Sequence, residues 1–291
     1  RIPAAVCGLV GLKPSRGRIP QDKRTREMPV KIVADGVVTR SVRDTAAFLR
    51  EAEKGYRNLK LRPVGDVVKP GRKRLKVAMV VDSVSHTTDP ECAEVVRRTG
   101  ELLESMGHHV EEVPPPVPPS FEDDFLAYWG LLSLFLTSTG KKTLSSSFDR
   151  SATEAFTQGL ARHGKRSLPR MPLAIARLQA SQVRSRRFHA AYDLTLTPVL
   201  GHPTRELGYL DPTQPFETTM ARLLERREGD PLQNATGDPA ISLPMGEDSR
   251  GLPIGVQLGA VQGREARLLE VAYELEEARP FRRIQDPIPG V

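Results

Sequence analysis

Apolar and polar positions follow helix and strand periods along most of the chain. Ser41 precedes a run to Gly55 whose apolar residues recur at helical spacing, which predicts a capped helix. Residues 75–82 form a short apolar run typical of an interior strand, residues 89–107 read as a helix that begins with Asp-Pro, and residues 109–113 read as a second strand. Strand, helix and strand within about forty residues are typical of a βαβ unit, so we expect parallel strands with covering helices.

The second half of the chain adds several helices and then a hairpin. Residues 120–192 read as helical, and residues 194–198 alternate like a strand. Two apolar runs, Ala240–Met245 and Pro253–Leu258, flank a polar turn and predict a hairpin, and residues 263–281 read as an amphipathic helix. These elements predict an α/β fold, with one domain and a helical insertion at about residues 120–192.

The first twelve residues read as buried structure. Pro3 suits the first turn of a short helix, Gly8 suits its end, and Leu9–Leu12 suits a strand. Because free chain ends are usually polar and exposed, this apolar start predicts that the natural sequence continues before Arg1.

The net charge of +7 is concentrated in one segment, from Ala155 to Tyr192, which contains no acidic residue. Its basic residues are Arg162, Lys165, Arg166, Arg170, Arg177, Arg184, Arg186 and Arg187. Few aromatic residues lie among them, and no nucleic-acid-binding motif surrounds them. We therefore interpret the segment as a solvated helix face and expect no nucleic-acid partner.

Composition also bears on the membrane and on the cellular compartment. No run approaches the eighteen or so apolar residues of a membrane span, so no membrane partner is expected. Cys7 and Cys92 lie far apart in the sequence, which favours two free thiols in a reducing, cytoplasmic compartment. A signal peptide before Arg1 stays an open alternative.

Local motifs do not identify a metal site or a nucleophile. The six histidines are scattered, and neither His-Glu-x-x-His nor Cys-x-x-Cys occurs, so no metal is expected. Ser138 and Lys141 form a Ser-x-x-Lys pair without the companion motifs of that chemistry, which favours a polar helix end. Residues 159–166 imitate a phosphate-binding loop, but an arginine stands where the magnesium-binding Ser or Thr belongs and the preceding residues look helical.

Residues 1–20 resemble the amidase signature family, whose diagnostic run reads Gly-Gly-Ser-x-Arg-x-Pro-Ala and then Cys-Gly-x-x-Gly-Leu-Lys-Pro. This pattern is matched without a gap by Arg1, Pro3, Ala4, Cys7, Gly8, Gly11, Leu12, Lys13 and Pro14. The similarity continues at residues 35–49, where Gly36-Val37 stands in place of the family's Gly-Pro, at residues 193–200, and in the segments from Asn234 to Phe281.

The resemblance implies an amide hydrolase with a Ser–cis-Ser–Lys mechanism, a mixed sheet with covering helices, and no cofactor. The family's nucleophile stands two residues before the position of Arg1, and its second serine, lysine and glycine-rich oxyanion loop lie further upstream. Residues 1–291 would then be the C-terminal part of a single amidase domain, truncated at its N-terminus and inactive alone. Arg1 would support the nucleophile loop. The candidate pocket residues are Trp129, in the substrate-side insertion, and Asn234, Thr236 and Gly237.

Three functions follow from this resemblance. The first is hydrolysis of a small-molecule carboxamide to a carboxylate and an amine or ammonia. The second is the A-type subunit of a tRNA-dependent amidotransferase, although residues 18–36 lack the Tyr-Gly-rich run expected of that subfamily. The third is a non-catalytic remnant. The oligomeric state, including a homodimer, stays open.

Overall fold

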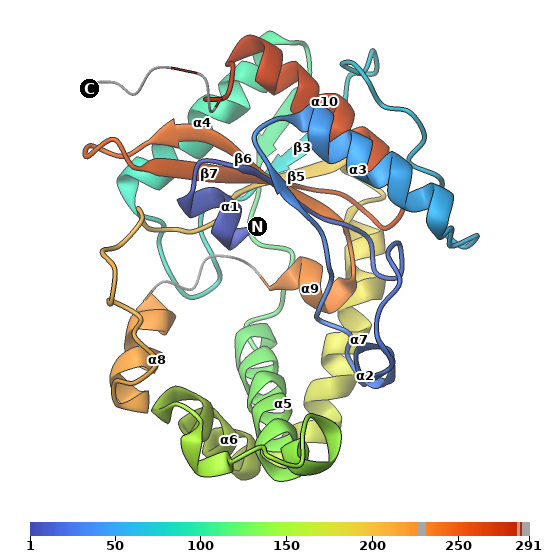
Figure 1. Ribbon diagram of the computed structural model, residues 1–291. Coiled ribbons are helices and arrows are strands. Elements are labelled where there is room, and N and C mark those ends of the chain that lie inside the picture. Colours follow the sequence, from blue (N-terminus) through green and yellow to red (C-terminus); the bar gives the residue numbers. More distant parts are fainter. Residues whose placement is uncertain (226–230, 284–285, 287–291) are drawn as a thin grey trace.

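The computed structural model describes residues 1–225, 231–283 and 286. In this part of the chain, seven strands form one mixed sheet with the order β2-β1-β6-β7-β5-β3-β4 (Figure 1). The strands are β1 (Val10–Lys13), β2 (Val38–Thr39), β3 (Lys76–Met79), β4 (His109–Glu112), β5 (Leu194–Pro198), β6 (Ala240–Glu247) and β7 (Pro253–Gly259).

Helices lie on both sides of this sheet. They are α1 (Ile2–Val6), α2 (Lys23–Glu27), α3 (Val42–Gly55), α4 (Pro90–Ser105), α5 (Phe121–Thr143), α6 (Ala155–Ser167), α7 (Met171–Phe188), α8 (Phe216–Glu225), α9 (Leu232–Thr236) and α10 (Glu265–Ala278). In Figure 1, α3, α4 and α10 cover the upper face of the sheet, and α5, α6 and α8 lie below it. The α/β fold class with a mixed sheet and covering helices is confirmed.

The elements with strong local signals form as predicted. β3, α4 and β4 make a βαβ unit in which Val77 pairs with Val110 in parallel. β6 and β7 form the antiparallel hairpin, with Leu243 opposite Val256. The Ser41 hydroxyl caps α3 by accepting the backbone N–H of Asp44 at 3.1 Å.

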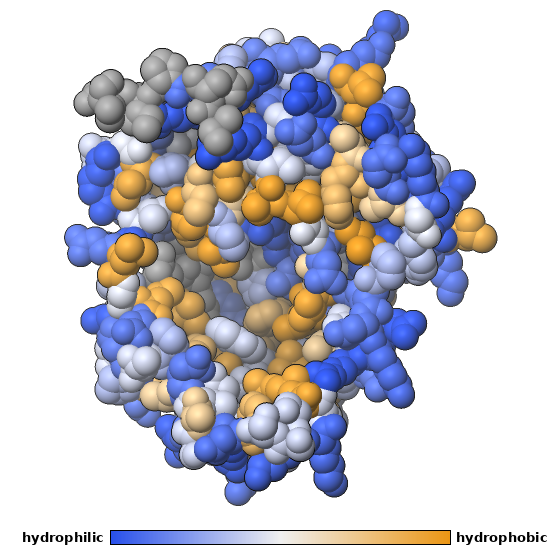
Figure 2. Space-filling view, viewed as in Figure 1, coloured by the Kyte–Doolittle hydropathy of each residue, from blue (hydrophilic) through white to orange (hydrophobic). Residues whose placement is uncertain are grey.

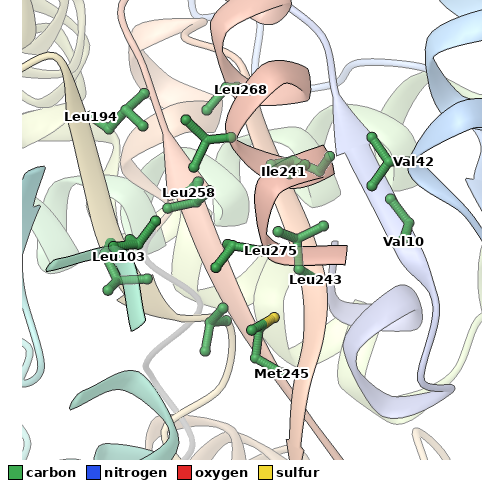
Figure 3. Close-up of a cluster of buried hydrophobic side chains, with 14 of the residues drawn as sticks. Val10, Val42, Leu103, Leu194, Ile241, Leu243, Met245, Leu258, Leu268 and Leu275 are labelled. Carbon is green, nitrogen blue, oxygen red and sulfur yellow. The ribbon is translucent and has the colours of Figure 1, made fainter. Parts of the chain in front are cut away.

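The sheet has one apolar face and one mixed face because its strands alternate with a period of two. The apolar face packs against α3, α4 and α10 and forms the main hydrophobic core (Figure 3). Residues of this core include Val10, Leu194, Leu196, Ile241, Leu243, Val256 and Leu258, all fully buried. The intervening positions of the same strands carry small and polar side chains, and they occupy the opposite face.

The helix α1 lies directly on this mixed face because two glycines leave room for it. A Cβ atom on Gly11 would stand 2.5 Å from the Cβ of Ala4, and one on Gly255 would stand 2.6 Å from the Cβ of Ala5. Any larger residue at either position would push α1 away from the strands. The glycines therefore set the height of Arg1, the N-cap of α1, above the sheet.

The helices α5, α6 and α7 form a second layer, in the region where the sequence predicts an insertion. Gly130 of α5 and Gly164 of α6 let these two helices touch backbone to backbone, since a Cβ on Gly164 would lie 2.2 Å from the Gly130 carbonyl. Tyr128 is fully buried in this layer and exchanges two hydrogen bonds with the backbone of Val30. That residues 1–291 belong to a single domain stays a prediction.

Two further expectations concern the cysteines and the membrane. Cys7 is exposed, Cys92 is buried, and both are free thiols. Across residues 1–225, 231–283 and 286, no helix has the length and apolar character needed to cross a bilayer.

Candidate active site

A cavity of about 770 Å³ lies between the mixed face of the sheet and the second helical layer. Figure 2 shows it as the hollow in the middle of the molecule, with apolar side chains along much of its rim. Its wall is formed by α1, β1, α5, α8, the end of β5 and the loops at residues 32–38 and 80–84. A largely apolar hollow with a few convergent polar groups is the usual form of a small-molecule site.

One wall of the cavity is apolar and aromatic. One face of α5 supplies Phe125, Leu126 and Trp129, because residues four positions apart lie above one another on a helix. Met220 and Leu223 of α8 continue this wall. The Trp129 ring packs against Phe156 with 5.7 Å between ring centroids, and Phe156 packs against Phe216 at 5.8 Å. This aromatic ladder joins α5, α6 and α8 and fixes the tryptophan at the cavity.

The floor of the cavity is polar and is organised around Arg1. The guanidinium Nη1 donates to Gln233 Oε1 at 3.2 Å and also to Gln257 Oε1, while Nη2 donates to Asn234 Oδ1 at 2.6 Å. Gln257 comes from β7, and Gln233 and Asn234 come from α9. Three amide oxygens from two distant segments therefore hold one guanidinium at the start of α1.

Lys13 lines the same cavity from β1. Its ammonium donates to the Pro14 carbonyl at 3.0 Å. The pKa of Lys13 is lowered from 10.5 to about 7, chiefly by burial and also by the positive charges of Arg1 and Arg16. Asp238 and Glu265 raise this pKa and offset part of the effect. A lysine that is partly neutral near pH 7 is therefore present at the cavity.

The predicted pocket residues divide into two groups. Arg1, Trp129 and Asn234 line the cavity. Thr236 and Gly237 are not among the residues that line it, and a place for them in a substrate pocket stays a prediction. Thr236 is fully buried within α9, and Gly237 ends that helix in the left-handed conformation, with φ of 79°. A side chain on Gly237 would meet those of Arg16 and Gln262, so its role is to turn the chain into β6.

Comparison with known proteins identifies the family. The model of the family described as Amidase matches residues 1–269. The chain belongs to the amidase family. A relative from Mycobacterium leprae named "Putative amidase AmiC" is 52% identical over 286 residues, which is 98% of this chain and 61% of the relative. A glutamyl-tRNA(Gln) amidotransferase protein of Moorella thermoacetica is 30% identical over 97% of this chain and 62% of its own length. The chain thus spans less than two thirds of the relatives that it matches.

Amidase structures confirm the fold. The structure of 6-aminohexanoate cyclic dimer hydrolase superposes with a TM-score of 0.81 and 28% sequence identity, over 98% of this chain and 64% of that one. The resemblance stated from the sequence is therefore confirmed, and so is the amidase signature fold.

Three residues of this site are not among those predicted from the sequence. Lys13 and Gln257 line the cavity, and Gln233 contacts Arg1 from α9. Lys13 and Gln257 enter that prediction only as parts of the segments that resemble the family, and Gln233 lies just before such a segment. The sequence feature that could have pointed to Gln257 is a polar residue within an otherwise apolar strand. In the sheet, Gln257 lies opposite Thr197 and Ser242. Such a residue needs partners, and here Arg1 is one of them.

The motifs rejected from the sequence are ordinary helix segments in the structure. Ser138 and Lys141 are exposed near the end of α5, and residues 159–166 lie within α6. In the described part of the chain, no group of three or more His, Cys, Asp or Glu side chains could hold a metal ion.

Proposed function

We propose that the protein is an amide hydrolase whose substrate is a neutral carboxamide with a bulky apolar group. Membership of the amidase family supports the reaction. The cavity supports the substrate class, because its polar floor at Arg1 faces an apolar wall at Trp129 and Met220. A carboxamide would place its amide group at the floor and bury its apolar part against the wall, where each buried methylene contributes about 0.8 kcal/mol.

The proposed nucleophile is a serine two positions before Arg1, with its partner serine and lysine further upstream. The position of Arg1 supports this proposal, because Arg1 lines the cavity and two residues of chain span at most about 7 Å. A serine hydroxyl needs a base beside it to attack a carbonyl, and a lysine with a lowered pKa can serve. On this proposal residues 1–291 alone are inactive.

The test compares residues 1–291 with the natural gene product that contains them. Both are assayed for release of carboxylate from a series of amides with growing alkyl or aryl acyl groups, from acetamide upward. We expect turnover only by the longer product, with kcat/KM rising with apolar size. Turnover by residues 1–291 would refute the upstream nucleophile, and absence of turnover by both would refute the hydrolase.

Trp129 tests the substrate class separately. In the active gene product, Trp129→Ala should lower kcat/KM for the bulkiest acyl groups by about tenfold or more, and change acetamide turnover little, because a small substrate does not reach the wall. The matched control is Phe135→Ala, since Phe135 lies on the same helix but is 56% exposed and outside the cavity. Equal losses for small and large substrates would refute the assignment of this wall to the apolar group.

One observation favours a role in a tRNA-dependent amidotransferase as a second candidate. The basic residues of α6 and α7 are all exposed and offer a positive surface. If this function holds, the gene product should bind tRNA, and reversing the charge at Arg177 and Arg184 should weaken binding. The gene product could instead hydrolyse amides without tRNA or partner proteins and show no salt-sensitive binding of tRNA. These two results together would favour the hydrolase over the amidotransferase subunit. Cytoplasmic location, a homodimer and the remnant alternative stay predictions.

A further inference from the structure

Gln257 is buried at the floor of the cavity, where it connects Arg1 to the sheet. Its side chain is 1% exposed. Its Oε1 accepts a hydrogen bond from Arg1, and its Nε2 donates to Thr197 Oγ1 at 3.2 Å and to Gln233 Oε1 at 3.3 Å. Arg1 is the N-cap of α1, Thr197 lies in β5 and Gln233 lies in α9, so these hydrogen bonds connect β7 to three other elements.

The chemistry of the partners allows the Gln257 amide only one orientation. A guanidinium has no acceptor, so the carbonyl oxygen of the amide must face Arg1. The Thr197 hydroxyl donates to the Pro198 carbonyl at 2.9 Å, so it accepts from the amide nitrogen of Gln257. Arg1 can only donate to Gln257, and Thr197 must accept from it. If the amide were flipped, its N–H groups would face the N–H groups of Arg1.

The guanidinium also anchors the start of α1. This helix has five residues, and Arg1, its N-cap, makes no side-chain cap hydrogen bond. Gly11 and Gly255 set the height of α1 above the sheet, but close packing of small residues does not fix the direction of the chain that enters the helix. The hydrogen bonds of Arg1 to the three amide oxygens supply that direction.

We propose that Gln257 is a positioning residue for amide hydrolysis, which acts through Arg1 on the backbone that enters α1. This inference rests on the proposed function, in which that backbone carries the nucleophile. In this role Gln257 acts through its hydrogen bond with Arg1. Loss of its oxygen would let Arg1 and the entering chain shift, and a displacement of about 1 Å at a nucleophile costs on the order of 100-fold in rate.

The test uses the active gene product with three substitutions of increasing severity. Gln257→Glu keeps an acceptor oxygen for Arg1 but loses the N–H donors to Thr197 and Gln233, so it should retain more of kcat than Gln257→Met. Gln257→Met removes the acceptor and should lower kcat by about 100-fold, with KM changed less than about threefold, because the apolar wall is intact. Arg1→Met removes the hydrogen bonds to all three amide oxygens and should lower kcat at least as much. The double variant should lose little more than Arg1→Met, because Gln257 acts only through Arg1.

The matched control is Gln182→Met. Gln182 also donates to another glutamine, Gln262, at 3.1 Å, but it lies on α7 outside the cavity. It should leave kcat unchanged. The rate of labelling by a fluorophosphonate, which reacts with an activated serine, gives a second readout independent of amide binding and should fall in parallel with kcat.

The outcomes separate this inference from the proposed function. An inactive parent gene product would refute the proposed function. An active parent with unchanged kcat and labelling in Gln257→Met would refute only the positioning role, as would fully additive losses in the double variant. If Gln257→Met does not fold, Gln257→Glu and Arg1→Met decide: a loss in Gln257→Glu as large as that in Arg1→Met would contradict the role of the acceptor oxygen.

Discussion

Lys13→Met should change how the stability of the protein depends on pH. Methionine keeps much of the volume and length of the lysine stem but cannot be charged. In the native protein, burial and the charge of Arg1 lower the pKa of Lys13 to about 7 from 10.5. Below about pH 7 the folded protein must therefore carry a half-buried ammonium, which the unfolded chain would hydrate fully.

The sign of the effect follows from proton binding. Between about pH 7 and pH 10.5 the unfolded chain keeps the Lys13 proton while the folded protein releases it, so the free energy of unfolding rises with pH across this window. The two pKa values differ by roughly 3.5, which corresponds to about 5 kcal/mol at full effect. Because Lys13 is half-buried and lines a cavity, solvent screening reduces this to about 2–3 kcal/mol.

Urea unfolding at about pH 6, 7.5 and 9 measures the effect directly. Lys13→Met should be more stable than the parent by about 2–3 kcal/mol at the lowest pH, and its advantage should shrink by roughly half at the highest. The control is Lys60→Met, since Lys60 is exposed, and its stability difference from the parent should not change with pH.

The pH dependence of the difference is the decisive quantity. Methionine also adds apolar contacts, but that gain is the same at every pH. A constant difference between Lys13→Met and the parent from about pH 6 to pH 9 would mean that Lys13 is hydrated and has an ordinary pKa. The reasoning from burial and Arg1 would then be refuted.

Two further predictions concern stability. Ser41→Ala removes the cap of α3 and should lower the free energy of unfolding, measured in urea titrations, by about 1 kcal/mol. The control, Ser105→Ala at an exposed hydroxyl, should change this free energy little. Equal effects of the two substitutions would contradict the capping role. Tyr128→Phe removes the phenol that bonds the N–H and C=O of Val30, and it should lower the free energy of unfolding by about 1–3 kcal/mol in thermal unfolding. The control, Tyr56→Phe at an exposed ring, should change it little. An unchanged Tm in Tyr128→Phe would contradict the role of these hydrogen bonds.

Elements whose signals are local could be predicted from the sequence. The cap at Ser41, the Asp89-Pro90 start of α4 and the polar turn between β6 and β7 each lie within a few residues of the structure that they specify. The short helix α9 gives no such signal and reads as a turn. Five residues are too few to show a helical period, and Pro231 at its N-cap makes no side-chain cap hydrogen bond.

The site was predictable only in part, because its geometry depends on the sheet register. The family resemblance led to Arg1, Trp129 and Asn234, all of which line the cavity. It did not lead to Gln257, whose partner Arg1 is 256 residues away. No periodicity within β7 shows that a distant helix will rest over this strand.

Strand alternation nevertheless explains why a polar residue at position 257 is tolerated. It makes Val256 and Leu258 face the core, so Gln257 faces the opposite side, where Gly11 and Gly255 bring α1 close. The amide can be buried there because α1 delivers a guanidinium to it. The glycines are therefore as necessary to the polar floor as the glutamine, since a larger residue at either position would lift Arg1 away and leave a buried amide oxygen without its donor.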